Sequence, residues 1–112
     1  LVTGGAGYIG SHMTRLLADR GHSVVVVDDL RRGNRKAVDS RATFAPLDVS
    51  DADALTALLV DHRIECVMHF AALAYVAESV EKPLEYYRNN VSGGFALLEA
   101  VSRANVGRMV FS

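Results

Sequence analysis

Short apolar runs of strand length alternate with longer stretches of helical period along the chain, and this alternation is the strongest constraint on its fold. Such an order is the signature of βαβ units around a parallel sheet. The run from Ser23 to Asp28 contains four consecutive valines without polar alternation, which is typical of a strand buried on both faces. We therefore expect an α/β fold with a doubly wound parallel sheet, three αβα layers and the strand order 3-2-1-4-5.

The pattern predicts about five strands and four helices, the fourth being only a weak turn of helix near 76–80. The expected strands are residues 1–3, 23–28, 43–46, 66–70 and 108–112. The three stronger helices are expected at residues 11–20, 51–61 and about 84–104. Gly21 ends the first of these, since glycine tolerates the left-handed cap conformation. Acidic residues begin the second, where they cap exposed amides.

Size and composition favour one compact unit. The chain has 112 residues, of which 50% are apolar, and a formal net charge of -1. This charge offers no basic surplus for nucleic acid or an anionic membrane. The longest apolar stretches, such as Val24 to Val27, are far shorter than the roughly 18 residues of a membrane span. A single cysteine, Cys66, excludes a disulfide framework, so we expect a cytoplasmic protein without a membrane segment. Because the chain opens at Leu1 without methionine and stops inside an expected strand at Ser112, we expect an N-terminal part of a longer enzyme.

The sequence TGGAGYIG, residues 3–10, places a GxxGxxG pattern between an expected strand and an expected helix. Gly4 permits the tight turn out of the strand, and Gly7 allows the backbone to approach a pyrophosphate. Gly10 allows the helix to pack closely on the sheet. The helix N-terminus then favours an anion. An ordinary glycine turn is the alternative for the motif taken alone.

A second marker, Asp28, lies at the end of the second expected strand, about 20 residues beyond the glycines. There a carboxylate can accept hydrogen bonds from adenosine ribose hydroxyls and repel a 2′-phosphate. The pattern thus predicts a Rossmann-type domain over residues 1–112 that binds NAD rather than NADP. Arg31 and Arg32 weaken this preference for NAD, since a nearby arginine accommodates the 2′-phosphate of NADP in such sites. We expect the arginine-rich stretch 31–41 to be a solvated loop, with a phosphate contact as the minority alternative.

Other candidate residues carry weaker signals. Asp48 and Val49 follow the third expected strand, where open α/β sheets bind ligands, so they are candidate adenine contacts. Asp48 alone would be interpreted as a helix cap. The four histidines lack ligand spacing, so no metal site is expected. His69 is interpreted as a core histidine, and Cys66 as a small buried apolar residue.

Taken together, these motifs resemble the UDP-glucose 4-epimerase family of extended short-chain dehydrogenases/reductases. The resemblance rests on TGGAGYIGSH, VVDDLRRGN, the LDV around Asp48, HFAALAYVAESVEKPLEYYRNNVSGG and the final VFS. It spans nearly the whole chain, and the segment from His69 to Gly94 separates it from generic Rossmann proteins. The resemblance implies NAD as cofactor, a UDP-sugar substrate, a role in galactose metabolism and a homodimeric full-length protein.

The resemblance also implies roles for particular residues. Tyr8 and Ile9 would lie along the pyrophosphate. The adenosine ribose would be surrounded by Asp28, Asp29, Leu30, Gly33 and Asn34. Asp48 and Val49 would flank the adenine. The wall under the cofactor would be formed by Phe70, Ala71, Ala72 and Leu73, and Asn89 would reach the cofactor from the long helix.

The family mechanism oxidises C4 of the sugar with bound NAD, rotates the 4-keto sugar and returns hydride to its other face. A tyrosine with a lysine four residues later serves as base. No tyrosine of this chain has that partner, since the only lysines are Lys36 and Lys82. We therefore name no catalytic residue and expect the pair downstream of Ser112.

Two departures concern substrate choice. Many family members carry a lysine at the position of Ala74 and an asparagine at that of Asp29. The first change leaves UDP-arabinose or UDP-xylose 4-epimerases as alternatives. A nucleotide-sugar 4,6-dehydratase and a non-catalytic NAD-binding module are further alternatives.

Overall fold

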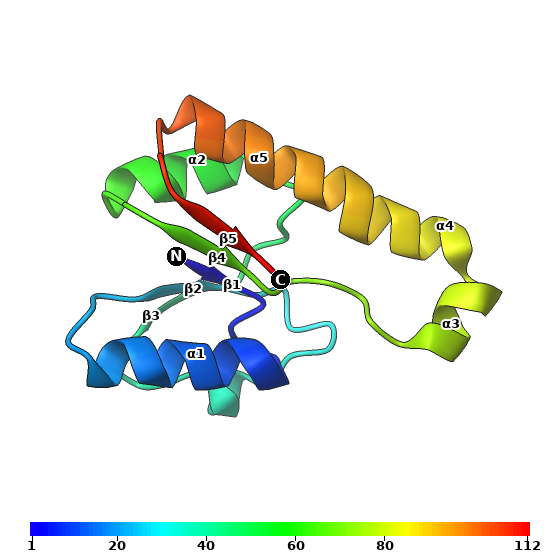
Figure 1. The fold of residues 1–112 in the computed structure, drawn as a ribbon, viewed down its shortest axis with the longest axis horizontal. Helices are drawn as coiled ribbons and strands as arrows, with labels where there is room; N and C mark the ends of the chain where they lie inside the picture. The colour runs from blue at the N-terminus through cyan, green and yellow to red at the C-terminus, as the bar shows by residue number, and fades with distance from the viewer.

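The structure is a computed structural model that describes all residues, 1–112, and its centre is a parallel sheet (Figure 1). The sheet has five strands in the order β3-β2-β1-β4-β5, which confirms the predicted topology. Val2 of β1 is in register with Val26 of β2 on one side and Met68 of β4 on the other. The strands are β1 (Val2–Thr3), β2 (Val25–Val27), β3 (Thr43–Ala45), β4 (Val67–His69) and β5 (Met109–Phe111).

Helices cover both faces of the sheet and make the expected three layers (Figure 1). Helix α1 (Tyr8–Asp19) lies on one face, and α2 (Ala52–Asp61) with α5 (Gly93–Arg103) on the other. The valines of β2 alternate between the two resulting cores, which explains their unbroken run. Val24 and Val26 belong to the core on the α1 side, whereas Val25 and Val27 pack with Leu55, Leu59 and Leu97.

The first helix starts earlier than its sequence indicates. It begins at Tyr8, not at Ser11, with Gly7 as its N-cap. The glycines hide the helix start from a pattern of apolar residues, although Gly10 sits inside the first turn. The predicted end is confirmed, since Gly21 follows with a φ of 82°. The acidic cap of α2 is confirmed as well, because the Asp51 side chain accepts a hydrogen bond from the amide of Ala54 at 3.0 Å.

The expected helix at 84–104 is divided into three continuous segments. These are α4 (Pro83–Tyr86), a π-helical segment (Tyr87–Ser92) and α5. The π-helical segment brings Asn89 and Asn90 over the end of the sheet, and such insertions are frequent at functional sites. The weak helical turn near 76–80 is a real helix, α3 (Val76–Glu81). A short 3-10 helix, Arg35–Ala37, interrupts the expected loop.

The structure also bears on the expected lack of a membrane span and on the burial of His69 and Cys66. None of the helices is both long and apolar enough to cross a membrane. His69 is 3% exposed and its Nδ1 lies 2.6 Å from the hydroxyl of Thr3, which confirms the satisfied core histidine. Burial lowers the pKa of His69. Cys66 was expected to be buried but is only half-buried, because it lies just before β4 and lines an open pocket at the amino ends of the strands.

Candidate functional site

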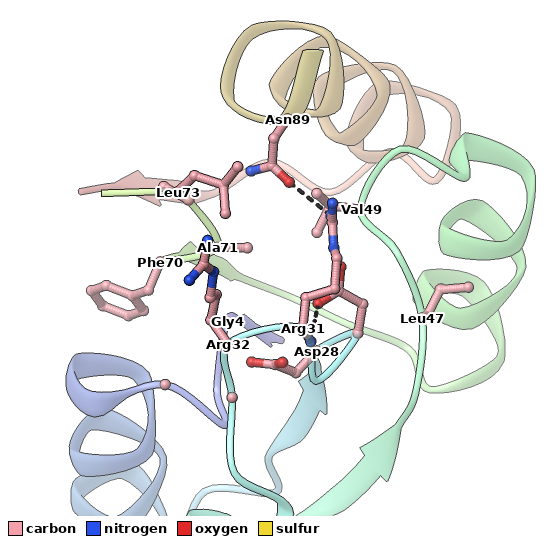
Figure 2. A pocket seen from close by; sticks show the side chains of 14 residues that line it. Gly4, Asp28, Arg31, Arg32, Leu47, Val49, Phe70, Ala71, Leu73 and Asn89 are labelled. Atoms are coloured by element: carbon pink, nitrogen blue, oxygen red, sulfur yellow. Dashed lines mark hydrogen bonds and ion pairs between the residues drawn. The ribbon is translucent and has the colours of Figure 1, made fainter. Parts of the chain in front are cut away.

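A cleft opens where β1, β2 and β4 end, at the carboxyl edge of the sheet (Figure 2). This is the edge at which open α/β sheets bind ligands, because the strand order reverses there. Its lining residues come from the glycine loop, the segments after β2, β3 and β4, and the π-helical segment. They are Gly4, Gly7, Asp28, Asp29, Arg31, Arg32, Gly33, Leu47, Val49, Phe70, Ala71, Ala72, Leu73 and Asn89.

The glycine loop forms the floor of the cleft because side chains cannot fit there. Gly4 has a φ of 69°, and a Cβ on it would lie 2.6 Å from the backbone nitrogen of Ala71. A Cβ on Gly10 would lie 2.2 Å from the carbonyl oxygen of Gly4. Gly7 is different, since its Cβ would meet only the Gly4 oxygen, at 3.2 Å. Gly4 and Gly10 are thus required by the fold, whereas Gly7 keeps space open in the cleft.

The N-terminus of α1 faces this space. Gly7 caps the helix without any side-chain hydrogen bond, and no acidic residue lies in the first turn. The first amides of a helix have no partner within it, and the helix dipole makes its N-terminus partly positive. An anionic group seated beside Gly7 is therefore stabilised by backbone alone.

Asp28 joins the glycine loop to the segment after β2. Its Oδ2 accepts a hydrogen bond from the amide of Ala6 at 3.0 Å, and its Oδ1 accepts one from Leu30 at 2.9 Å. Leu30 has a φ of 62°, a left-handed conformation that costs a branched side chain about 1–2 kcal/mol. Gly33 closes the turn against this carboxylate, since a Cβ there would lie 2.6 Å from Oδ1. Asp28 is buried, with further lone pairs left for a ligand hydroxyl.

Two arginines that we expected in a solvated loop lie on the cleft wall. Arg31 donates from Nη2 to Oδ1 of Asn89 at 2.8 Å, across the opening (Figure 2). It also pairs with Asp29 through Nε, and with Asp48 at 3.4 Å. Burial alone would raise the pKa of Asp48, but hydrogen bonds from Ser50 and the charge of Arg31 lower it on balance.

Arg32 is held by the opposite side of the cleft. Its Nη2 lies 2.6 Å from both carboxylate oxygens of Glu78 in α3, and its guanidinium lies 5.0 Å from the Tyr75 ring centroid. The hydroxyl of Tyr86 donates to Glu78 at 2.8 Å. Hydrogen bonds from Tyr86 and Arg32 lower the pKa of Glu78. Both arginines are thus cationic wall residues with carboxylate partners.

The far wall after β4 is fixed by Asn90, a residue that sequence reasoning missed. Its Oδ1 accepts a hydrogen bond from the amide of Leu73 at 2.9 Å, and its Nδ2 donates to the carbonyl oxygen of Leu73 at 2.9 Å. The Nδ2 of Asn89 also donates to Asn90 at 2.9 Å. Asn90 therefore positions the wall, while Asn89 faces the cleft. The adjacent asparagines at 89 and 90 were the only sequence signal.

The structure brings most of the candidate residues together at the cleft. Some candidates lie beside it without lining it, and Tyr8 and Ile9 have side chains 83% and 60% exposed. Both residues are in the first turn of α1, next to Gly7. The candidates outside the lining are Tyr8, Ile9, Gly10, Leu30, Asn34 and Asp48. Arg31, Arg32 and Leu47 line it although we did not name them as site residues.

A tyrosine and a lysine beside the cleft both contact Glu78. Tyr86 is buried, and burial together with its hydrogen bond to Glu78 raises its pKa, the opposite of what a tyrosine base needs. Lys82 lies 3.6 Å from Glu78 and serves as its counterion.

The sheet order, the glycine loop and the buried Asp28 together define a Rossmann-type fold of the dinucleotide-binding class. The chain belongs to the NAD dependent epimerase/dehydratase family, whose model matches residues 1–112.

Individual relatives agree with this assignment. The chain is 53% identical over 112 residues to UDP-glucose 4-epimerase of Lactobacillus helveticus, covering all of this chain and 34% of that protein. It resembles the solved UDP-glucose-4-epimerase of Stenotrophomonas maltophila with bound NAD and formylated UDP-arabinopyranose, with a TM-score of 0.96 and 43% identity over 98% of this chain and 35% of that one. It also resembles the solved UDP-glucose 4-epimerase of Brucella ovis in complex with NAD. The TM-score is 0.95 and the identity 44%, over 98% of this chain and 34% of that one. The chain thus spans about a third of these proteins' length.

Proposed function

We propose that residues 1–112 are the N-terminal, NAD-binding part of a longer enzyme, a UDP-glucose 4-epimerase. In this proposal the full-length protein interconverts UDP-glucose and UDP-galactose through a 4-keto intermediate. The observation that carries the proposal is the similarity to UDP-glucose 4-epimerases across the whole chain, cleft included. Turnover of UDP-galactose by the full-length protein tests the reaction.

The residues of the cleft suit NAD. The space above Gly4 and Gly7, beside the helix N-terminus, accepts a pyrophosphate without a competing side chain. Asp28 is placed to accept hydrogen bonds from the adenosine ribose. Val49 with Leu47 gives an apolar surface for the adenine, and the wall from Phe70 to Leu73 supports the remainder together with Asn89. When bound, NAD supplies the hydride acceptor for oxidation at C4 of the sugar.

Asp28→Asn in the full-length protein is expected to narrow the preference for NAD over NADP. The change removes the charge that repels a 2′-phosphate, while the amide oxygen still accepts one of the two backbone hydrogen bonds. Asp28→Ser should narrow the preference too, but its shorter side chain loses contact with Ala6 and costs more stability. Dissociation constants for both dinucleotides, measured by calorimetry, check this. Equal affinity for both in the unmutated protein would contradict the role of Asp28.

A UDP-pentose 4-epimerase is the second candidate function. It is favoured by Ala74, which stands where many family members have lysine. Side-by-side turnover of UDP-galactose and UDP-arabinose by the full-length protein decides between the two, and activity on the pentose alone would overturn the first proposal.

We also propose that the full-length protein is a cytoplasmic homodimer. Its interface would be the outer face of the continuous helical stretch that runs from α4 through the π-helical segment to α5. Five apolar side chains recur there at helical spacing with at least 45% of each exposed, which is unusual for an unpartnered surface. They are Leu84, Tyr87, Val91, Phe95 and Leu98.

Phe95→Asp is expected to convert the full-length dimer to monomer, because a charge in the centre of an apolar interface leaves a buried unpaired carboxylate. Phe95 is 69% exposed in this chain, so the fold itself should tolerate the change. Val60→Asp is the matched control, since Val60 is 57% exposed on α2, outside this face. Light scattering after size-exclusion chromatography gives the mass. A dimer that survives Phe95→Asp, or dissociates equally with Val60→Asp, would overturn the proposed interface.

A further inference from the structure

Both arginines that could accept a 2′-phosphate lie on the wall of the cleft, three and four positions after Asp28. In related sites an arginine near this position is what admits NADP. Asp28 alone therefore gives an incomplete account of cofactor choice, because two cationic side chains line the same cleft as the carboxylate that would repel a 2′-phosphate.

Arg31 is held by partners from three segments of the chain. Its Nε pairs with Asp29, and the amide of Arg31 also donates to Asp29 at 2.9 Å. Its Nη2 donates to Asn89 at 2.8 Å and lies 3.4 Å from Asp48. The hydrogen bond to Asp29 is the main reason that the pKa of Arg31 is raised. Figure 2 shows Arg31 directed toward Asn89.

We infer that Asp29 is a specificity-determining residue for the dinucleotide, and that it acts by holding and neutralising Arg31. With Asp29 in place, the guanidinium is engaged and a second carboxylate stands next to Asp28, so a 2′-phosphate meets repulsion without a free cation. Without it, Arg31 keeps only Asn89 and the more distant Asp48, and its Nε is free to donate to a phosphate oxygen. This inference rests on the proposal that the cleft binds NAD.

Asp29→Asn in the full-length protein is expected to raise the share of NADP bound relative to NAD about tenfold, the size of one hydrogen bond to a charged group. Asparagine has nearly the same size as aspartate and the Asp29 side chain is 27% exposed, so we expect the fold to accept the change. Protein stripped of nucleotide is refolded with equimolar NAD and NADP, desalted, and the two bound dinucleotides are quantified by chromatography.

Two further variants separate the causes. In the double variant Asp29→Asn with Arg31→Gln, the gain in NADP should disappear, because the liberated arginine is gone. Asp53→Asn is the matched control, since Asp53 also pairs with an arginine, Arg103, at 2.7 Å, but lies outside the cleft. It changes net charge identically and should leave the ratio unchanged.

The possible results are distinct. If the unmutated protein retains NAD and Asp29→Asn leaves the ratio unchanged, the inference is overturned while the proposed function stands. A gain that persists without Arg31 overturns the part assigned to that arginine. If the unmutated protein retains neither dinucleotide, the proposed function itself fails.

Discussion

Replacing Gly7 by valine in the full-length protein is expected to weaken NAD binding at least about 100-fold, or about 2.7 kcal/mol, while the fold persists. Gly7 has a φ of -80°, which any residue adopts, and an added Cβ meets only the Gly4 oxygen. The valine side chain instead occupies the space in which the pyrophosphate approaches the helix N-terminus. Calorimetry with NAD measures the loss, and the thermal unfolding temperature without NAD should fall less than in Gly10→Ala, because the added Cβ lies 3.2 Å rather than 2.2 Å from the Gly4 oxygen.

Two other glycines serve as comparisons for this result. Gly107→Ala should leave both affinity and stability unchanged, because nothing lies within 4 Å of its added Cβ. Gly10→Ala should instead destabilise the protein, since its Cβ would come within 2.2 Å of a backbone oxygen. An unaltered affinity for NAD in Gly7→Val would show that the phosphates do not approach this turn.

The full-length protein is expected to convert UDP-galactose to UDP-glucose, whereas residues 1–112 alone should show no turnover. The chain has no tyrosine with a lysine four residues later, and Tyr86 has a raised pKa. A positioned base contributes about 100-fold to 10,000-fold, and positioning of the reactant contributes more. Both losses act together in the shorter chain. UDP-glucose formation is followed with purified full-length protein and with residues 1–112 in separate assays.

The comparison needs a control for folding. Circular dichroism of residues 1–112 shows whether the inactive sample retains its helices, and NAD titration shows whether the cleft still binds. Turnover by a folded sample of residues 1–112 would contradict the absence of a base. Turnover of neither UDP-galactose nor UDP-arabinose by the full-length protein would contradict the proposed reaction.

The parts of the molecule that depend on local patterns were predictable from the sequence. The consecutive valines of β2 indicated a parallel sheet covered on both faces. The structure confirms the predicted strand order. Gly4, Gly7 and Asp28 were expected at one edge of this sheet, and the structure places all three on the cleft. These features follow from backbone constraints that few residue types satisfy.

The remainder depends on contacts between distant segments. Arg31 and Arg32 belong to a polar stretch that resembles a solvated loop, and only the positions of Asn89 and Glu78 turn them toward the cleft. The hydrogen bond between Leu73 and Asn90 likewise requires the π-helical segment. The spacing of apolar residues does not reveal such a segment. The early start of α1 was missed because glycine is a poor indicator of helix.

A structure of the full-length protein with NAD is the decisive test of the proposed binding site. We expect one dinucleotide in this cleft, with its pyrophosphate beside Gly7 at the N-terminus of α1 and its adenosine ribose hydroxyls hydrogen-bonded to Asp28. NAD seated elsewhere, or in this cleft with its pyrophosphate away from Gly7, would contradict it.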